Sequence, residues 1–275
     1  MNTLHISFGA HYVTVASELT ELCRELTTMV EPMLRLQTRG TQVGFLKVSL
    51  TGNSFVVRGS DASLPQSLPE STAAARAVYH RSIRMLMAAR DDLLWIHAGV
   101  VCLSGQAVVM AAPSGHGKST MVGECVSRAW RYMSDDIAPI DPADGTVVPF
   151  PLSPYKRVSA DVEFTEEQVH RLKKVSIQLS RDAVSRVGAP ITDIYFLRYA
   201  PGCSVTRIVQ CSAGQAVMEL LRNSLSPCES RHTELERLCR LAVRVRAHFL
   251  HYSSAVKAVQ EVIAARMESP QRVAI

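Results

Sequence analysis

Lys118 belongs to a short stretch whose residue types suit the binding of phosphate groups. The stretch reads Ala112-Pro113-Ser114-Gly115-His116-Gly117-Lys118-Ser119-Thr120. Glycines let a backbone curl closely around a ligand because they carry no Cβ. In a phosphate-binding loop (P-loop), the lysine reaches the β- and γ-phosphates of a nucleotide and the next hydroxyl coordinates Mg²⁺. We therefore predict a P-loop for ATP and Mg²⁺ in which the nucleotide contacts Ser114, Gly115, His116, Gly117, Lys118, Ser119 and Thr120.

The residues on both sides of this stretch predict the elements that would present it to a ligand. Ala107–Ala111 is an apolar run that predicts a strand, and Ser119–Ala129 predicts a helix. A helix N-terminus has unpaired N–H groups and a favourable dipole, so it attracts phosphate oxygens. The common pattern begins with glycine, and Ala112 takes that place here. A chance Gly/Ser-rich turn is the alternative, and the flanking strand and helix favour nucleotide binding.

An acidic pair lies at the end of the next predicted strand. Asp135 and Asp136 follow Tyr132-Met133-Ser134, and Asp135 comes 17 residues after Lys118. A strand–helix–strand path returns the chain beside the loop, so both carboxylates would face the γ-phosphate. A kinase needs one carboxylate for the metal and one to accept the proton of the attacking hydroxyl. A solvated turn is the alternative for such a pair.

Two further side chains are candidates for the same site. His97 follows the apolar run Leu93-Leu94-Trp95-Ile96. A lone histidine among apolar residues is more often a hydrogen-bonded core residue than a catalytic one, and both interpretations stay open from the residues alone. Arg198 lies in a predicted strand over 191–199 and is a weaker candidate for reaching the site.

Composition and charge are those of an ordinary globular protein. The 275 residues are 47% hydrophobic and 20% charged, with a net charge of +5 that suits an anionic ligand but does not indicate nucleic acid. The seven cysteines include no C-x-x-C pair, so neither a zinc site nor a disulfide framework is indicated. With no signal-peptide pattern and no long apolar run, we expect a cytoplasmic protein without membrane contact. A homo-oligomer is left open.

Hydrophobic periodicity predicts an α/β fold in two parts. The first is an α+β module over 1–62, with a helix over 17–36 and a hairpin over 43–58. A Ser- and Pro-rich linker over 59–69 would separate it from a domain over 70–275. That domain would open with a helix over 69–90 and end with helices over 213–224 and 231–241, a strand over 243–249 and a helix over 253–266.

The combination of these motifs resembles the HPr serine kinase/phosphorylase family, whose core is related to phosphoenolpyruvate carboxykinase. The matching residues are His97-Ala98-Gly99-Val100-Val101, Pro113–Ser119 and Asp135-Asp136, with His97 21 residues before Lys118. The resemblance extends over 93–154 and implies a P-loop kinase core. It implies that Asp135 accepts the proton of the substrate hydroxyl and that Asp136 and Ser119 hold Mg²⁺. It also places His97 beside the acidic pair as a third catalytic residue with Asp135 and Lys118.

The sequence departs from the family pattern in two places, and these departures narrow the part of the family that it resembles. The segment 149–158 lacks the family's Glu-Leu/Ile-Arg-Gly run, and the N-terminal third differs from that of the bifunctional enzymes. The chain is therefore more similar to the stand-alone HPr-kinase-like proteins, some of which phosphorylate a serine of a ribosomally made peptide such as a lasso peptide. The resemblance implies an ATP-dependent serine kinase with a peptide or protein substrate. Lys156 and Arg157 would contact a phosphate or an acidic peptide end, or lie in an ordinary solvated loop.

Two other functions remain as alternatives. One is a kinase of a free small molecule such as an amino acid or a sugar, which a narrow acceptor pocket would favour. The other is a nucleotide-binding regulatory protein with little turnover, which the intact pair Asp135 and Asp136 disfavours.

Overall fold

The chain folds into two compact units. The computed structural model describes residues 1–34, 40–152, 155–157, 174–176, 179–225 and 231–268. The first unit spans Met1–Asp91 together with residues 150–152, and the second begins at Asp92 and takes in the rest of the described chain. Among these residues, no helix is both long and apolar enough to cross a bilayer.

The N-terminal unit is a five-stranded sheet with its strands in the order β1-β2-β3-β4-β5. Its elements are β1 (Asn2–Phe8), β2 (His11–Ser17), α1 (Thr20–Val30), the 3₁₀ turn η1 (Glu31–Met33), β3 (Thr41–Thr51), β4 (Ser54–Gly59), β5 (Gln66–Leu68) and α2 (Ser71–Ala88). β2 and β3 are parallel and the other neighbours are antiparallel. The predicted hairpin over 43–58 is therefore present as β3 and β4, and the helix predicted over 17–36 is shorter.

The boundary between the units lies later than the sequence suggested. The helix α2 was expected to open the second domain, but it contacts α1 and the strands β2, β3 and β4 of the N-terminal sheet. Its buried Arg81 forms an ion pair with Asp61 and donates to the carbonyl of Val57. The expected linker over 59–69 contains β5, which pairs with β4. The chain consequently leaves this unit after Asp91 and not near residue 62.

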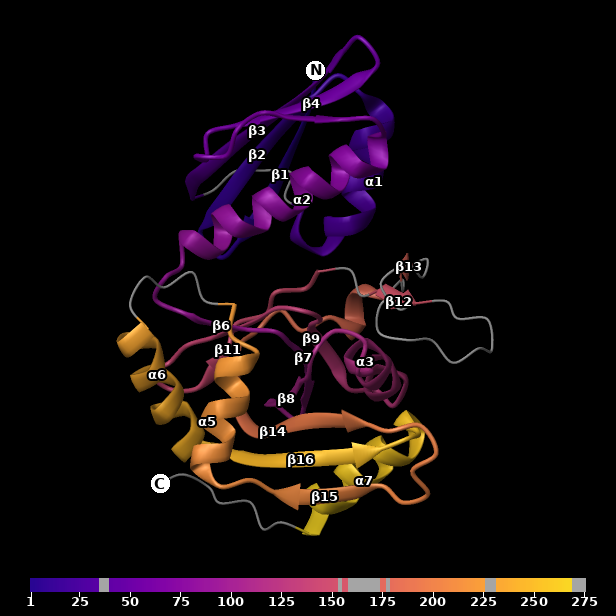
Figure 1. The fold of residues 1–275 in the computed structure, drawn as a ribbon, viewed down its shortest axis with the longest axis vertical. Coiled ribbons are helices and arrows are strands. Elements are labelled where there is room, and N and C mark those ends of the chain that lie inside the picture. Colours follow the sequence, from indigo (N-terminus) through magenta and orange to yellow (C-terminus); the bar gives the residue numbers. More distant parts are fainter. Residues whose placement is uncertain (35–39, 153–154, 158–173, 177–178, 226–230, 269–275) are drawn as a thin grey trace. The chain divides into compact units, whose positions relative to one another are not determined.

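The second unit contains a larger sheet. Its described elements are β6 (Leu94–Ile96), β7 (Ala98–Leu103), β8 (Gln106–Ala111), α3 (Lys118–Ser127), β9 (Arg131–Ser134), β10 (Ala138–Ile140), β11 (Thr146–Val147), β12 (Tyr155–Arg157), β13 (Lys174–Ser176), the 3₁₀ turn η2 (Arg181–Ala183), β14 (Ala189–Tyr199), β15 (Arg207–Gln210), α5 (Ala213–Arg222), α6 (Arg231–Arg244), β16 (Arg246–Tyr252) and α7 (Ala255–Glu268). Within the described residues the main sheet has nine strands. Along its centre, β9, β7, β8, β14, β16 and β15 lie side by side (Figure 1).

Helices cover both faces of this sheet, which gives three layers. Successive residues of a strand face opposite sides, and β8 shows this clearly. Val109 packs in the same apolar cluster as residues of α5 and α6, whereas Val108 and Met110 pack with residues of α3 and α7. A strand that is apolar on both faces is typical of a buried central position.

The strand directions bring three connections to one edge of the sheet. β8 and β14 are parallel, and so are β14 and β16, so their carboxyl ends point the same way. β7 is antiparallel to β8, so its first residue, Ala98, pairs with the last residue of β8, Ala111. β9 is antiparallel to β7, and its last residue, Ser134, pairs with Val100. The residues before β7 and after β8 and β9 therefore meet at this edge, which we call the carboxyl edge.

A smaller departure from the sequence prediction lies near the C-terminal end of the described chain. The strand expected over 243–249 is β16, three residues later, because α6 continues through Arg244. Lys156 and Arg157 lie in β12, which pairs with β13, but their side chains lie outside the described residues.

Candidate functional site

A glycine-rich loop, Ala112–Gly117, joins the buried strand β8 to the helix α3 at the carboxyl edge. Pro113, Ser114 and Gly115 are exposed, and His116 is half-buried. Gly117 caps α3, and the first turn of α3 contains no acidic residue that would repel an anion. The first N–H groups of a helix have no partner within the helix. Loop and helix end together form a surface that favours phosphate oxygens.

The shape of this loop depends on Gly117 and on a tyrosine from β16. Gly117 has a φ of 84°, a left-handed conformation that favours glycine. A Cβ at this position would collide with the hydroxyl oxygen of Tyr252. That hydroxyl donates to the carbonyl of His116 at 3.0 Å. Burial raises the pKa of Tyr252, so its hydroxyl stays protonated as a donor. Tyr252 thus fixes the loop from the neighbouring strand.

Lys118 lies at the centre of the carboxyl edge. It is the first residue of α3, and only 4% of it is exposed. Its ammonium group donates to the carbonyls of Ala112 at 2.7 Å and Pro113 at 3.2 Å, and it contacts Nε2 of His97 at 2.9 Å. The lysine therefore folds back over the glycine-rich loop and reaches across to the residue that precedes β7.

His97 connects Lys118 to the acidic pair. Its Nδ1 lies 2.9 Å from the carbonyl oxygen of Asp136. An ammonium group can only donate, so Nε2 of His97 must accept from Lys118, and Nδ1 must carry the proton that is donated to Asp136. These two contacts require the neutral ring. The structure places His97 in the polar cluster at the carboxyl edge, and its catalytic role stays a prediction.

Asp135 is a buried carboxylate directly beneath this cluster. It is 3% exposed, and its Oδ1 has no hydrogen-bond partner among the described residues. Burial, together with the charge of Asp136, raises the pKa of Asp135 to about 7, although Ser119 forms a side-chain hydrogen bond to it and the Lys118 charge opposes the rise. A carboxyl group with a pKa near neutrality can gain or lose a proton under ordinary conditions.

The remaining predicted site residues lie around Asp135. Ser119 is half-buried and contacts Asp135, whereas Thr120 is exposed one residue further along α3. Asp136 is half-buried and has a φ of 69°, a left-handed conformation that is uncommon for a residue other than glycine. Such backbone outliers cluster at functional sites.

These residues fit a magnesium ion that also binds a nucleotide. Mg²⁺ prefers oxygen ligands and is usually held by one or two carboxylates together with substrate phosphates. Ser119, Asp135 and Asp136 offer a hydroxyl and two carboxylates, and the unpartnered Oδ1 of Asp135 is a ready ligand or proton acceptor. Among the described residues, no cluster of three or more His, Cys, Asp or Glu could hold a metal unaided.

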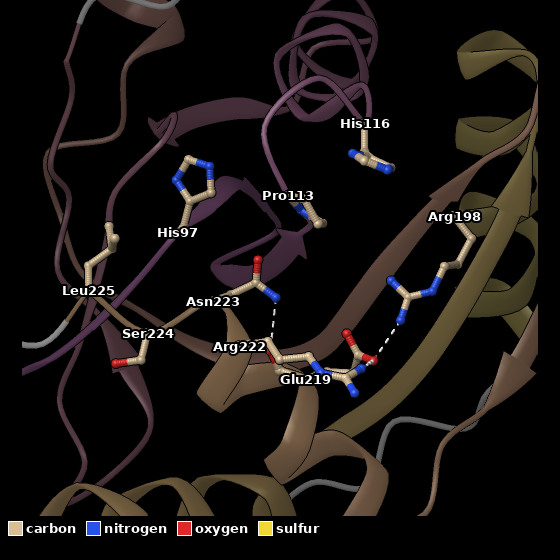
Figure 2. Close-up of a pocket in the computed structure, with 9 residues that line it drawn as sticks. All are labelled: His97, Pro113, His116, Arg198, Glu219, Arg222, Asn223, Ser224 and Leu225. Atoms are coloured by element: carbon tan, nitrogen blue, oxygen red, sulfur yellow. Dashed lines mark hydrogen bonds and ion pairs between the residues drawn. The ribbon is translucent and has the colours of Figure 1, made fainter. Parts of the chain in front are cut away.

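A pocket of about 430 Å³ opens in front of the glycine-rich loop. Figure 2 shows His97 and Pro113 on one side of it and residues of α5 on the other. The C-terminal end of α5 is held there because the N–H of His97 donates to the carbonyl of Asn223 at 2.6 Å. The lining consists of His97, Pro113, His116, Arg198, Glu219, Arg222, Asn223, Ser224 and Leu225.

Several of these residues were not identified from the sequence. Arg198 was a weak candidate, and the structure places it in the pocket wall at the end of β14. Glu219, Arg222 and Tyr252 were missed altogether. The three-residue spacing of Glu219 and Arg222 on a predicted helix was visible, but an ion pair on a solvated face has the same spacing.

Comparison with known proteins gives a distant structural likeness and no match in sequence. The sequence matches no protein-family model and no curated protein. Among solved structures, the fold is similar to that of the Hpr(Ser) kinase/phosphatase from Coxiella burnetii, with a TM-score of 0.34 and 10% sequence identity. The match covers 64% of this chain and 99% of the other.

Proposed function

We propose that this protein is a kinase that transfers the γ-phosphoryl group of ATP, with Mg²⁺, to a hydroxyl group of a peptide or protein, most simply that of a serine. The observation that supports this most directly is the meeting of Lys118, His97 and Asp135 at one edge of the sheet, beside a glycine-rich loop and a helix N-terminus. His97 precedes β7, Lys118 follows the loop after β8, and Asp135 follows β9. A phosphate site beside a proton acceptor forms only where these three segments meet.

In this proposal the donor phosphates lie on the glycine-rich loop. The N–H groups of the loop and of the first turn of α3 would bind phosphate oxygens, and Lys118 would neutralise charge on the transferring group. Lys118 would exchange some of its present acceptors, the carbonyls of Ala112 and Pro113, for phosphate oxygens. Because these acceptors are neutral, a charged phosphate is the stronger partner.

The acidic pair would serve the acceptor and the metal. As the acceptor oxygen forms its bond to the γ-phosphorus, the bond from that phosphorus to the β–γ bridging oxygen breaks and ADP leaves with the electron pair. The proton of the acceptor hydroxyl passes to the Asp135 carboxylate, whose pKa of about 7 suits this role. Ser119 and Asp136 would hold Mg²⁺, which neutralises charge on the phosphates when it is bound.

The surface around the loop supports a peptide acceptor over a free small molecule. A second pocket of about 390 Å³ shares Glu219 and Arg222 with the first and adds Met218 and Phe249 to its lining. An acceptor longer than a single amino acid can therefore extend from the loop over α5.

The proposal is tested by transfer of label from ATP to serine-containing peptides in the presence of Mg²⁺. We expect wild type to label an acceptor and Lys118→Ala and Asp135→Asn to lose transfer. The Mg²⁺ dependence separates the two acids: Asp136→Asn should need more Mg²⁺, whereas Asp135→Asn should stay slow at saturating Mg²⁺.

Equal labelling by wild type, Lys118→Ala and Asp135→Asn would exclude this site as the active centre. Tight ATP binding without transfer, unchanged in Asp135→Asn, would instead indicate a regulatory nucleotide-binding protein.

A further inference from the structure

The pocket in front of the glycine-rich loop has a wall of paired charges opposite the loop. Arg198 from β14 and Arg222 from α5 both contact Oε1 of Glu219, at 2.7 and 2.9 Å. The dashed lines in Figure 2 show both guanidinium groups converging on this one carboxylate. The side chain of Glu219 is 9% exposed, so it is held in the wall and is not a solvated surface acid.

The two arginines are held very differently. Arg198 also donates to the carbonyl of Leu197 at 3.3 Å, and its guanidinium lies 4.9 Å from the centre of the Phe249 ring. Its side chain is 31% exposed and has a fixed place in the wall. The side chain of Arg222 is 67% exposed, and its one described contact is with Glu219. Arg222 is therefore the partner that can turn toward a ligand.

The charges of this wall do not balance. Two guanidinium groups carry two positive charges against the single negative charge of Glu219, which leaves one positive charge facing the pocket. Each guanidinium has five N–H donors, and one carboxylate cannot accept them all. A second carboxylate would neutralise the excess charge and pair with the planar fork of Arg222 in the bidentate geometry that arginine favours.

We propose that this wall is the acceptor subsite and that it binds a carboxylate group of the acceptor while the acceptor hydroxyl faces the glycine-rich loop. This inference rests on the proposed kinase function and adds the chemical class of the acceptor. A singly charged carboxylate matches the excess charge of the wall better than a doubly charged phosphate does. A nucleotide base fits less well, because charged and polar residues dominate the lining and Pro113 and Leu225 are its apolar members.

The carboxylate can come from a free hydroxy acid or from a peptide that ends in a hydroxyl-bearing residue. Three probes separate these sources: N-acetylserine, an acetylated Gly-Gly-Ser peptide with a free carboxylate, and the same peptide as its C-terminal amide. We expect the carboxylate peptide to have a KM at least about tenfold below that of the amide, as for a charge-assisted hydrogen bond. N-acetylserine would equal the carboxylate peptide only if the chain beyond the terminal residue contributes nothing.

Arg222→Gln is the decisive variant, because Arg222 is exposed and its loss should leave the fold intact. It should abolish the preference for the carboxylate peptide over the amide and leave the Kd for ATP unchanged. Arg240→Gln, on the exposed face of α6, is the matched control and should keep the preference. Calorimetric binding of the peptide pair in the presence of a non-hydrolysable ATP analogue gives a readout that does not depend on turnover.

The outcomes distinguish this inference from the proposed function. If both peptides bind and react equally while Lys118→Ala is inactive, the kinase proposal stands and the carboxylate subsite is wrong. If Arg222→Gln weakens ATP binding and leaves the peptide preference intact, the pocket belongs to the nucleotide and the subsite is again wrong. If calorimetry shows that the carboxylate peptide and the amide peptide bind equally and neither is phosphorylated, the carboxylate subsite is wrong. This result would not test the proposed kinase function.

Discussion

Two buried aspartates of the second unit lie at opposite edges of the same sheet and have opposite surroundings. Asp135 follows β9 at the carboxyl edge, where it has an acidic neighbour in Asp136 and an oxygen with no partner among the described residues. Asp193 lies in β14 toward the amino end of β16, where it pairs with Arg246. It is 2% exposed, against 3% for Asp135, so burial alone does not separate them.

Both carboxylate oxygens of Asp193 have an arginine partner. Arg246 contacts Oδ1 at 2.8 Å, and Arg266 from α7 forms a second ion pair with the other oxygen. Arg266 is fixed in turn by Thr192 and Gln106, each at 2.8 Å. A buried charge with its full set of partners is a structural feature, whereas a buried charge that lacks them costs stability and is maintained by function. The difference between the two acids predicts which substitutions affect activity and which affect folding.

The largest expected effect is the loss of activity in Asp135→Asn. An amide cannot accept the proton of the acceptor hydroxyl, and a positioned general base contributes about a thousandfold to the rate. Phosphoryl transfer at saturating substrates measures this loss. Because the substitution also removes an unfavourable buried charge, the variant should unfold at a urea concentration no lower than that of wild type. An Asp135→Asn protein that is active but unstable would reverse the comparison.

Asp193→Asn should show the opposite pattern. Its loss leaves Arg266, with a side chain only 11% exposed, without its counter-charge. Removing one partner of a buried ion pair costs about 3 kcal/mol of folding free energy. Urea unfolding measures this cost, and the activity of each folded molecule should remain that of wild type. Arg246→Ala is the milder control, because Arg246 is 44% exposed and water can replace its contacts.

The raised pKa of Asp135 predicts a pH dependence of stability in the absence of nucleotide and Mg²⁺. The folded protein keeps this proton up to about pH 7, whereas the unfolded chain releases it near 3.8, the ordinary pKa of an aspartate. Between these two pH values the folded state binds more protons, so its stability falls as the pH rises and levels off above about pH 7. Relative to wild type, Asp135→Asn should gain stability on the order of 4 kcal/mol across this window, because each pKa unit corresponds to about 1.4 kcal/mol.

Urea midpoints at about pH 5 and about pH 8 test this slope. Glu261→Gln, which changes an exposed acid of α7, should follow wild type at both values. A constant difference between wild type and Asp135→Asn at the two pH values would mean that Asp135 has an ordinary pKa.

The contrast also shows what could be predicted from the sequence. Hydrophobic periodicity predicted most strands and helices. The spacing of His97, Lys118 and Asp135 predicted that these three residues belong to one site. These residues lie next to strand ends, and strand ends are visible in an apolar pattern. The sequence did not show that Asp193 is paired with two arginines. Arg246 and Arg266 lie 53 and 73 residues away from it in the chain.

The sequence prediction missed the charged pocket wall of α5 and misplaced the boundary between the units for a related reason. Glu219 becomes a buried ligand of two arginines only when α5 lies against the end of β14. A helix with a polar residue at that position looks the same before packing. The assignment of α2 to the N-terminal unit likewise depends on contacts with α1 and β2–β4, not on the composition of the segment over 59–69.

The smallest expected effect concerns the one hydroxyl that fixes the glycine-rich loop. Tyr252→Phe removes the hydrogen bond to the carbonyl of His116 and should cost about 1 kcal/mol, or about fivefold in the Kd for ATP. The rate at saturating ATP should change little, because the hydroxyl of Tyr252 contacts the glycine-rich loop and not the acidic pair in the described hydrogen bonds. Tyr199→Phe, which alters the exposed tyrosine whose ring lies edge-on to Tyr252 at 5.6 Å, should leave the Kd unchanged.

A double-mutant cycle with Gly117→Ala tests the same contact. A methyl group on Gly117 would collide with the Tyr252 hydroxyl, so the alanine should weaken ATP binding more in wild type than in the Tyr252→Phe background. Some loss should persist in both backgrounds, because alanine is strained at a φ of 84°. Equal losses in the two backgrounds would show that the tyrosine does not hold the loop, and the strain at Gly117 alone would then set its shape.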